Sequence, residues 1–161
     1  MKKLLKILFY ILLVLYLFLV LYITFLSRPS MASDTDRLEY AGRMMNLVPF
    51  KTISLYVRSL RKGNLIRISV ANLLGNLLLI MPVGFMLPVL FKKMKKLHVC
   101  LIFCLLMLIV IEILQLITMR GSFDVDDLIL NMTGAVIGFV VQKMIFIGIA
   151  KKNRKAADNN D

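Results

Sequence analysis

RGSFDVDDLILNMTG, residues 120–134, is the stretch around which this chain is organised. It carries Asp124, Asp126 and Asp127 in a protein with 21 Lys+Arg and only 9 Asp+Glu, and it separates two long apolar runs. A chain that crosses a bilayer twice must turn back at such a junction, where polar groups reach water again. The segment is therefore expected to hold three carboxylates and Arg120 at a membrane surface.

The composition agrees with a membrane location. Of the 161 residues, 60% are hydrophobic, which is more than a soluble domain of this length uses for its core. Apolar runs of roughly 20 residues are what a bilayer core of about 30 Å requires of a spanning helix. The sequence thus predicts an integral membrane protein.

The apolar runs predict an all-α membrane protein with four transmembrane helices, at about residues 7–27, 68–91, 97–118 and 127–150. Residues 1–150 form the membrane domain, with an extracellular loop at 28–67, and residues 151–161 a basic, polar cytoplasmic tail that we expect to be disordered. The first run is longer than the apolar core of a cleaved signal peptide, which is about 7 to 15 residues. We interpret it as a retained helix, with cleavage near the small residues 30–33 as the alternative.

The loop contains a short amphipathic pattern after NLVPF, residues 46–50. Ile53, Tyr56, Val57 and Leu60 share one helical face, and basic residues lie largely elsewhere. This pattern predicts an interfacial helix between the first two spans, ended by Gly63. A solvated loop with incidental spacing is the alternative.

Polar residues recur inside the spans. Asn72 and Asn76 share a face of the second span, where Pro82 predicts a kink that marks either a binding site or a packed bend. Glu112 and Gln115 share a face of the third span, and an intramembrane carboxyl group indicates function by default.

Other features of these spans favour packing. The fourth span contains Asn131 and a GxxxG pattern at Gly134 and Gly138, which allows close helix contact. Cys100 and Cys104 are interpreted as small buried hydrophobes and not as a disulfide or metal site.

Charge predicts the orientation. Lysines near the N-terminus, at 92–96 and at 151–155 flank the spans on one side, which the positive-inside rule makes cytoplasmic. Both termini of this multi-pass cell-membrane protein are then cytoplasmic and the acidic segment faces outward. The eight basic residues of loop 28–67 weigh against this, although long loops obey the rule less strictly. The net charge of +12 suits anionic membrane lipids as partners and not nucleic acid.

Taken in order, several segments resemble the VanZ-like family of bacterial membrane proteins. They are NLVPF (46–50), NLLGN (72–76) through MPVG (81–84), EILQ (112–115), and Arg120 through Asp127 to NMTG (131–134). Met132 separates Asn131 from Thr133, where related proteins often have asparagine followed directly by threonine. The founding member is associated with resistance to teicoplanin, a lipid-tailed glycopeptide antibiotic that acts on cell-wall precursors at the outer membrane surface. The resemblance implies a role there and supplies no catalytic mechanism.

The first hypothesis is a non-enzymatic protein whose outer-leaflet pocket holds an amphiphile, such as a lipoglycopeptide or a lipid-linked wall precursor, with no cofactor or metal. The candidate ligand-binding residues are Asn72, Asn76, Glu112, Gln115, Arg120, Asp124, Asp127 and Asn131. The oligomeric state stays open.

The second hypothesis is a membrane-embedded enzyme acting on a lipid-linked wall precursor or a lipid head group. The three aspartates would hold a cation and Glu112 would act as a general base, but no nucleophile with an evident base is found in the sequence. The third hypothesis is a proton or ion pathway through Glu112.

A purely structural role for the acidic segment remains beside these hypotheses. In it Asp124 caps the fourth helix, Asp126 and Asp127 lie in its first turn, and Arg120 forms an ion pair with Asp124 or Asp127.

Overall fold

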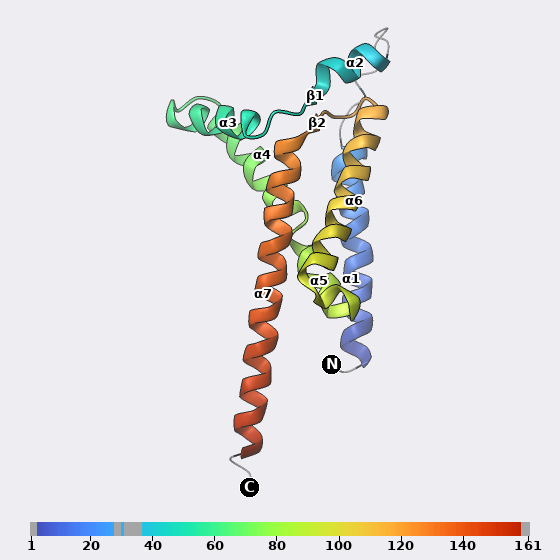
Figure 1. Ribbon diagram of the computed structural model, residues 1–161, viewed down its shortest axis with the longest axis vertical. Helices are drawn as coiled ribbons and strands as arrows, with labels where there is room; N and C mark the ends of the chain where they lie inside the picture. Colours follow the sequence, from blue (N-terminus) through green and yellow to red (C-terminus); the bar gives the residue numbers. More distant parts are fainter. Residues whose placement is uncertain (1–2, 28–29, 31–36, 159–161) are drawn as a thin grey trace.

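The computed structural model describes residues 3–27, 30 and 37–158, and these residues are predominantly helical (Figure 1). The elements are α1 (Lys3–Leu21), the π-helix η1 (Tyr22–Leu26), α2 (Arg37–Met44), β1 (Met45–Asn46), α3 (Lys51–Arg61), α4 (Ile66–Leu79), α5 (Met81–Leu90), the 3-10 helix η2 (Lys93–Lys95), α6 (Leu97–Ile117), β2 (Phe123–Asp124) and α7 (Val125–Asp158). The predicted all-α fold class is confirmed.

Within the described residues, four helical stretches are long and apolar enough to cross a membrane: Lys3–Leu26, Ile66–Leu90, Leu97–Ile117 and Val125–Lys152. A helix of about 20 residues is about 30 Å long, which matches the bilayer core. Large apolar side chains such as Leu15 and Leu106 remain exposed on these helices, as lipid-facing positions require. The chain is thus a multi-pass membrane protein, with the start of α1 and the end of α7 at one end and α2 and α3 at the other (Figure 1).

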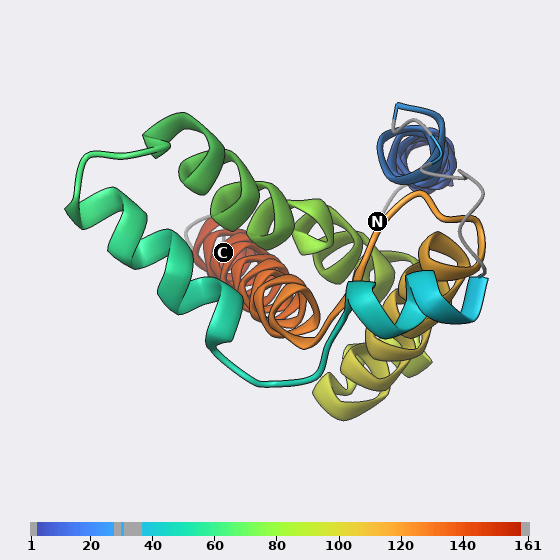
Figure 2. The ribbon, with the colours of Figure 1, turned by 90° about the horizontal axis from the view of Figure 1, so that it is seen from above.

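Helix α7 is the central element, because it packs against α4, α5 and α6. Seen from above, it lies among α3, α4 and α6 (Figure 2). A Cβ added to Gly134 or Gly138 would overlap the backbone carbonyl oxygen of Leu77 or Met81, and one at Gly84 would overlap Ala135. The close helix contact that the GxxxG pattern predicts is confirmed, and α4 and α5 are the helices that approach α7.

The core lies where α1, α5, α6 and α7 meet. Cys100, Cys104 and Leu108 of α6 are buried there with Val83 and Phe139. Both cysteines are free and fully buried. Their interpretation as small buried hydrophobes is confirmed.

The second span is two helices. Helix α4 ends at Leu79 and α5 begins at Met81, with Pro82 in the first turn of α5. Proline lacks the N–H that would continue the helix but suits the start of a new one. The predicted kink is confirmed.

Two features differ from the sequence prediction or were not predicted. Helix α7 continues to Asp158, so the expectation of a disordered tail from residue 151 is wrong for 151–158, where Lys, Arg and Ala favour helix. The short parallel pair of β1 with β2, which aligns Met45 with Phe123 and Asn46 with Asp124, was not predicted. Residues 31–33 of the alternative cleavage site lie outside the described residues.

The interfacial helix expected after Pro49 is α3, and Gly63 follows it with a φ of 71°. Ile53, Tyr56 and Leu60 are half-buried, and α3 packs against α4 and the start of α7. The helix is therefore confirmed, and part of its apolar face is covered by the protein itself.

Candidate functional site

The β1–β2 pair brings the acidic segment against the NLVPF loop. Asp124 is buried and its Oδ1 accepts hydrogen bonds from the Asn46 amide at 3.0 Å and from the backbone N–H of Asp126 at 2.9 Å. Its Oδ2 accepts the Thr52 hydroxyl at 2.6 Å. Asp124 therefore caps the start of α7, as predicted, and also binds the segment that leads into α3.

Asp126 caps a different helix from the one in which it lies. Its side chain is fully buried, and its Oδ1 accepts the backbone N–H of Phe50 at 2.5 Å. Its Oδ2 accepts the N–H groups of Thr52 at 2.7 Å and Ile53 at 3.0 Å. Helix N-termini leave such donors without intrahelical partners and favour a negative charge. One carboxylate thus fixes α3 to α7.

The backbone at the start of α3 is strained to make these contacts. Phe50 has a φ of 63°, in the left-handed region that non-glycine residues rarely adopt. Residues held in this way cost on the order of 1–3 kcal/mol each and persist where the surroundings enforce them. The three N–H groups that converge on Asp126 are the contacts that enforce it here.

Asp127 joins α7 to α4. Its carboxylate accepts a hydrogen bond from the Asn76 amide, and its backbone carbonyl accepts one from Asn131 Nδ2 at 2.8 Å. Asn131 is 2% exposed, and its Oδ1 has no hydrogen-bond partner among the described residues. Asn72, half-buried on α4, donates to the carbonyl of Ile68 in its own helix at 2.9 Å.

Tyr56 of α3 lies beside this acidic cluster, which comprises Asp124, Asp126 and Asp127. Partial burial raises the pKa of the Tyr56 phenol above its ordinary value, and the negative charges of Asp127 and Asp124 raise it further. The phenol is therefore held in its neutral form over the physiological pH range.

Gln115 of α6 and Arg120, which follows α6, contact η1. The Gln115 amide donates to the Thr24 carbonyl at 3.1 Å, and the Arg120 guanidinium donates to the Phe25 carbonyl at 2.6 Å. These are carbonyls near a helix end, where intrahelical donors run out and a cation is favourable. Glu112 is buried one turn before Gln115 on the same helix.

Six of the eight candidates therefore fall into groups with different partners, and Asn72 and Glu112 belong to none of these groups. Asn76, Asp127 and Asn131 meet at α4 and α7, Asp124 binds the NLVPF loop, and Gln115 and Arg120 bind η1. Three site residues, Asn46, Thr52 and Tyr40, were not among the candidates from the sequence, and Asp126 was expected in the first turn of its own helix or in a cation site. Tyr40 of α2 donates its hydroxyl to the Gly121 carbonyl at 3.0 Å. The polar turn at NLVPF could have marked Asn46 and Thr52 as site residues. Nothing in the local sequence indicates that residue 46 pairs with residue 124.

The acidic cluster directs its carboxylates to Asn46, Asn76 and the start of α3. Among residues 3–27, 30 and 37–158, no three His, Cys, Asp or Glu side chains are arranged to hold a metal ion. The cation site considered for the three aspartates is therefore not formed by this arrangement.

The family comparison agrees with the ordered motifs. The model of the VanZ/LLP1 family matches residues 13–147, which is most of the chain and includes all eight candidates. No curated protein and no solved structure gives a significant match. The chain belongs to the VanZ/LLP1 family of proteins.

Proposed function

We propose that this protein is a non-enzymatic membrane protein that engages an amphiphilic molecule of the bacterial cell envelope at the outer leaflet. In this proposal both termini are cytoplasmic and the acidic cluster faces outward. The distribution of charge supports this orientation: lysines flank the spans at the end that holds the start of α1 and the end of α7. The acidic cluster lies at the opposite end, next to α3.

The observation that carries the proposal is the attachment of α3 to α7 by Asp126. The attachment holds an amphipathic helix against α4 and the start of α7. The exposed residues of α3 are both apolar and basic: Lys51, Leu55, Val57, Arg58 and Arg61. A helix with this mixture lies in the interface between headgroups and acyl chains. Its apolar residues can contact the apolar tail of an amphiphilic ligand, and its basic residues can bind the anionic or polar groups of that ligand.

The resemblance to a family whose founding member is associated with teicoplanin resistance indicates which amphiphiles are candidate ligands. Teicoplanin and the lipid-linked wall precursors are both amphiphiles that reside at the outer membrane surface. The exposed face of α3 is the proposed contact surface for such a molecule. Asp124, Asp126 and Asp127 would act as positioning residues beneath it, since their carboxylates bind inside the protein.

The test compares two double variants with equal charge changes in a teicoplanin-sensitive bacterial host. Arg58→Gln with Arg61→Gln alters the exposed face of α3, whereas Arg43→Gln with Arg67→Gln removes two exposed arginines outside α3. We expect the α3 variant to lose teicoplanin protection and the control to keep it, at equal membrane abundance, with vancomycin sensitivity unchanged in both.

Full protection by the α3 double variant would contradict the proposed contact surface. Mass spectrometry of lipids and wall precursors, with and without the protein, tests the non-enzymatic part separately. A species that appears or disappears with the protein would contradict it in favour of a membrane-embedded enzyme.

A further inference from the structure

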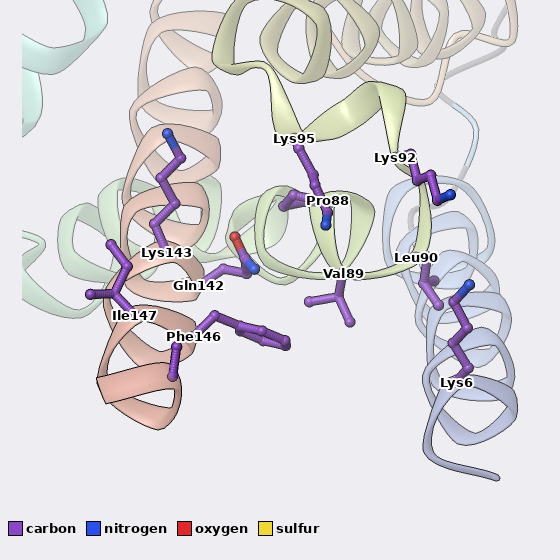
Figure 3. A pocket seen from close by; sticks show the side chains of 11 residues that line it. Lys6, Pro88, Val89, Leu90, Lys92, Lys95, Gln142, Lys143, Phe146 and Ile147 are labelled. Atoms are coloured by element: carbon purple, nitrogen blue, oxygen red, sulfur yellow. The ribbon is translucent and has the colours of Figure 1, made fainter. Parts of the chain in front are cut away.

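A cavity of about 670 Å³ lies at the end of the molecule opposite the acidic cluster (Figure 3). It is bounded by α1, the end of α5 with the connection that follows, and the part of α7 between Gln142 and Ala150. Its wall is partly apolar, formed by Pro88, Val89, Leu90, Phe146, Ile147 and Ala150. Figure 3 shows Phe146 extending from α7 toward the side of α5 that carries Val89.

Lysines line the same cavity from three directions. Lys6 comes from α1, Lys92 and Lys95 from the connection after α5, and Lys143 from α7 (Figure 3). No carboxylate is among the described lining residues, and the sequence has no Asp or Glu between residues 128 and 157. Four like charges around one cavity repel one another unless an anion occupies it.

The amide of Gln142 supplies a second kind of donor, which is neutral. Gln142 is 7% exposed, lines the cavity, and makes no hydrogen bond with the other described residues. In Figure 3 its amide end points from α7 toward Pro88 and Lys95. This orientation places a neutral hydrogen-bond donor at the cavity beside the lysines.

The position of Lys143 agrees with a built site. Its ammonium lies 5.1 Å from the centre of the Phe139 ring on the preceding turn of α7. This cation–π contact restrains a side chain that would otherwise be free to extend into solvent. In Figure 3 the side chain of Lys143 extends along α7, away from the amide of Gln142.

We propose that this cavity binds the headgroup of an anionic phospholipid from the leaflet that faces the two termini. Phosphate oxygens would accept hydrogen bonds from the lysines and from Gln142, and an acyl chain would lie along the apolar wall formed by α7. Basic pockets between membrane helices recognise lipid headgroups by this combination of charge and apolar contact. A free phosphate would use only the polar half of the lining. The inference is independent of the proposed function at the other end.

Native mass spectrometry of the full-length protein, titrated with phosphatidylglycerol or with phosphatidylcholine, tests the proposal. The test variant is Lys92→Gln with Lys95→Gln and Lys143→Gln. The matched control is Lys96→Gln with Lys151→Gln and Lys152→Gln, because these exposed lysines of the same end do not line the cavity.

We expect the wild type and the control to prefer phosphatidylglycerol. The test variant should bind it about 100-fold more weakly, at about fivefold per lysine. A test variant that keeps the wild-type preference would overturn the proposal, as would inorganic phosphate or glycerol 3-phosphate that displaces the lipid at equal concentration. A lipid with a photoreactive acyl chain should crosslink to the peptide that contains Phe146 in the wild type, and labelling elsewhere only would also overturn it.

Discussion

At the scale of single residues, Asp126 shows how one carboxylate joins two helices. It lies in the first turn of α7, where an acidic residue is favourable for its own helix. Its oxygens nevertheless accept three N–H groups at the start of α3. A fully buried carboxylate is costly unless it is hydrogen-bonded in this way, so the contact accounts for its burial.

Asp126→Asn should weaken the attachment of α3. The amide keeps one acceptor oxygen but places an NH₂ group against backbone donors, and an unmatched buried donor costs on the order of 1–3 kcal/mol. We expect lower thermal stability in detergent and faster hydrogen exchange at the amides of Thr52 and Ile53.

Glu39→Gln is the control for this change. It removes an equal charge from an exposed ion pair with Arg43 on α2, and such pairs contribute about 0–1 kcal/mol. Equal exchange rates at Thr52 and Ile53 in wild type and Asp126→Asn would contradict the capping role.

Tyr56 provides a pH test of the same region. Its folded pKa is raised by burial and by Asp127 and Asp124, whereas the unfolded phenol titrates near 10.0. As the pH rises, the phenol of the unfolded state ionises before that of the folded state. The stability that neutral Tyr56 contributes is therefore fully present below pH 10.0 and is lost as the pH rises through the pKa of the folded state.

Absorbance of tyrosinate at alkaline pH, taken as wild type minus Tyr56→Phe, should show a midpoint above pH 10.0. In an Asp127→Asn background this difference curve should move to lower pH, since one negative charge near the phenol is removed. A wild-type midpoint at or below 10.0 would be inconsistent with the structure.

At the scale of elements, the close packing of α7 against α4 and α5 requires glycine, which has no side chain, at two positions. Gly134 and Gly138 face backbone carbonyls of α4 and α5 at distances that leave no room for a Cβ. Overpacking of a close contact typically costs about 1–3 kcal/mol. The contact is between backbones, which cannot move aside as a flexible side chain does.

Gly134→Ala should therefore lower the melting temperature of the purified protein. Gly148→Ala is the matched control on the same helix, because a Cβ there meets nothing within 4 Å. Alanine is the better helix former, so the control should melt at or above the wild-type temperature. A Gly134→Ala protein as stable as the control would mean that α7 does not pack this closely.

The elements also show what the sequence could predict. The spans follow from apolar length, α3 from the spacing after Pro49, and the break near Pro82 from the missing N–H. The β1–β2 pair has only two residues in each strand, too few for a pattern, and it joins Asn46 to Asp124 across 78 positions.

Among the site residues, both Asn76 and Asp127 were candidates, but their mutual hydrogen bond was not predicted. The role of Asp126 was missed because capping rules are local to one helix, whereas this carboxylate caps a helix 65 or more residues earlier in the chain.

At the scale of the whole molecule, the two ends carry different features. One end holds the acidic cluster and α3, and the other holds the lysine-lined cavity and the start and end of the membrane domain (Figures 1 and 3). The proposed ligand contact at α3 requires the first end to face outward, which places the second end on the cytoplasmic side. The orientation of the protein in the membrane is therefore the central claim.

Cysteine accessibility in right-side-out membrane vesicles tests that claim most directly. Asn64 lies exposed after α3, and Lys93 lies exposed in the connection after α5. The native Cys100 and Cys104 are fully buried, so the parent protein should remain unlabelled and serves as the control. A membrane-impermeant maleimide should label Asn64→Cys in intact vesicles and Lys93→Cys only after permeabilisation; the reverse pattern would contradict the account.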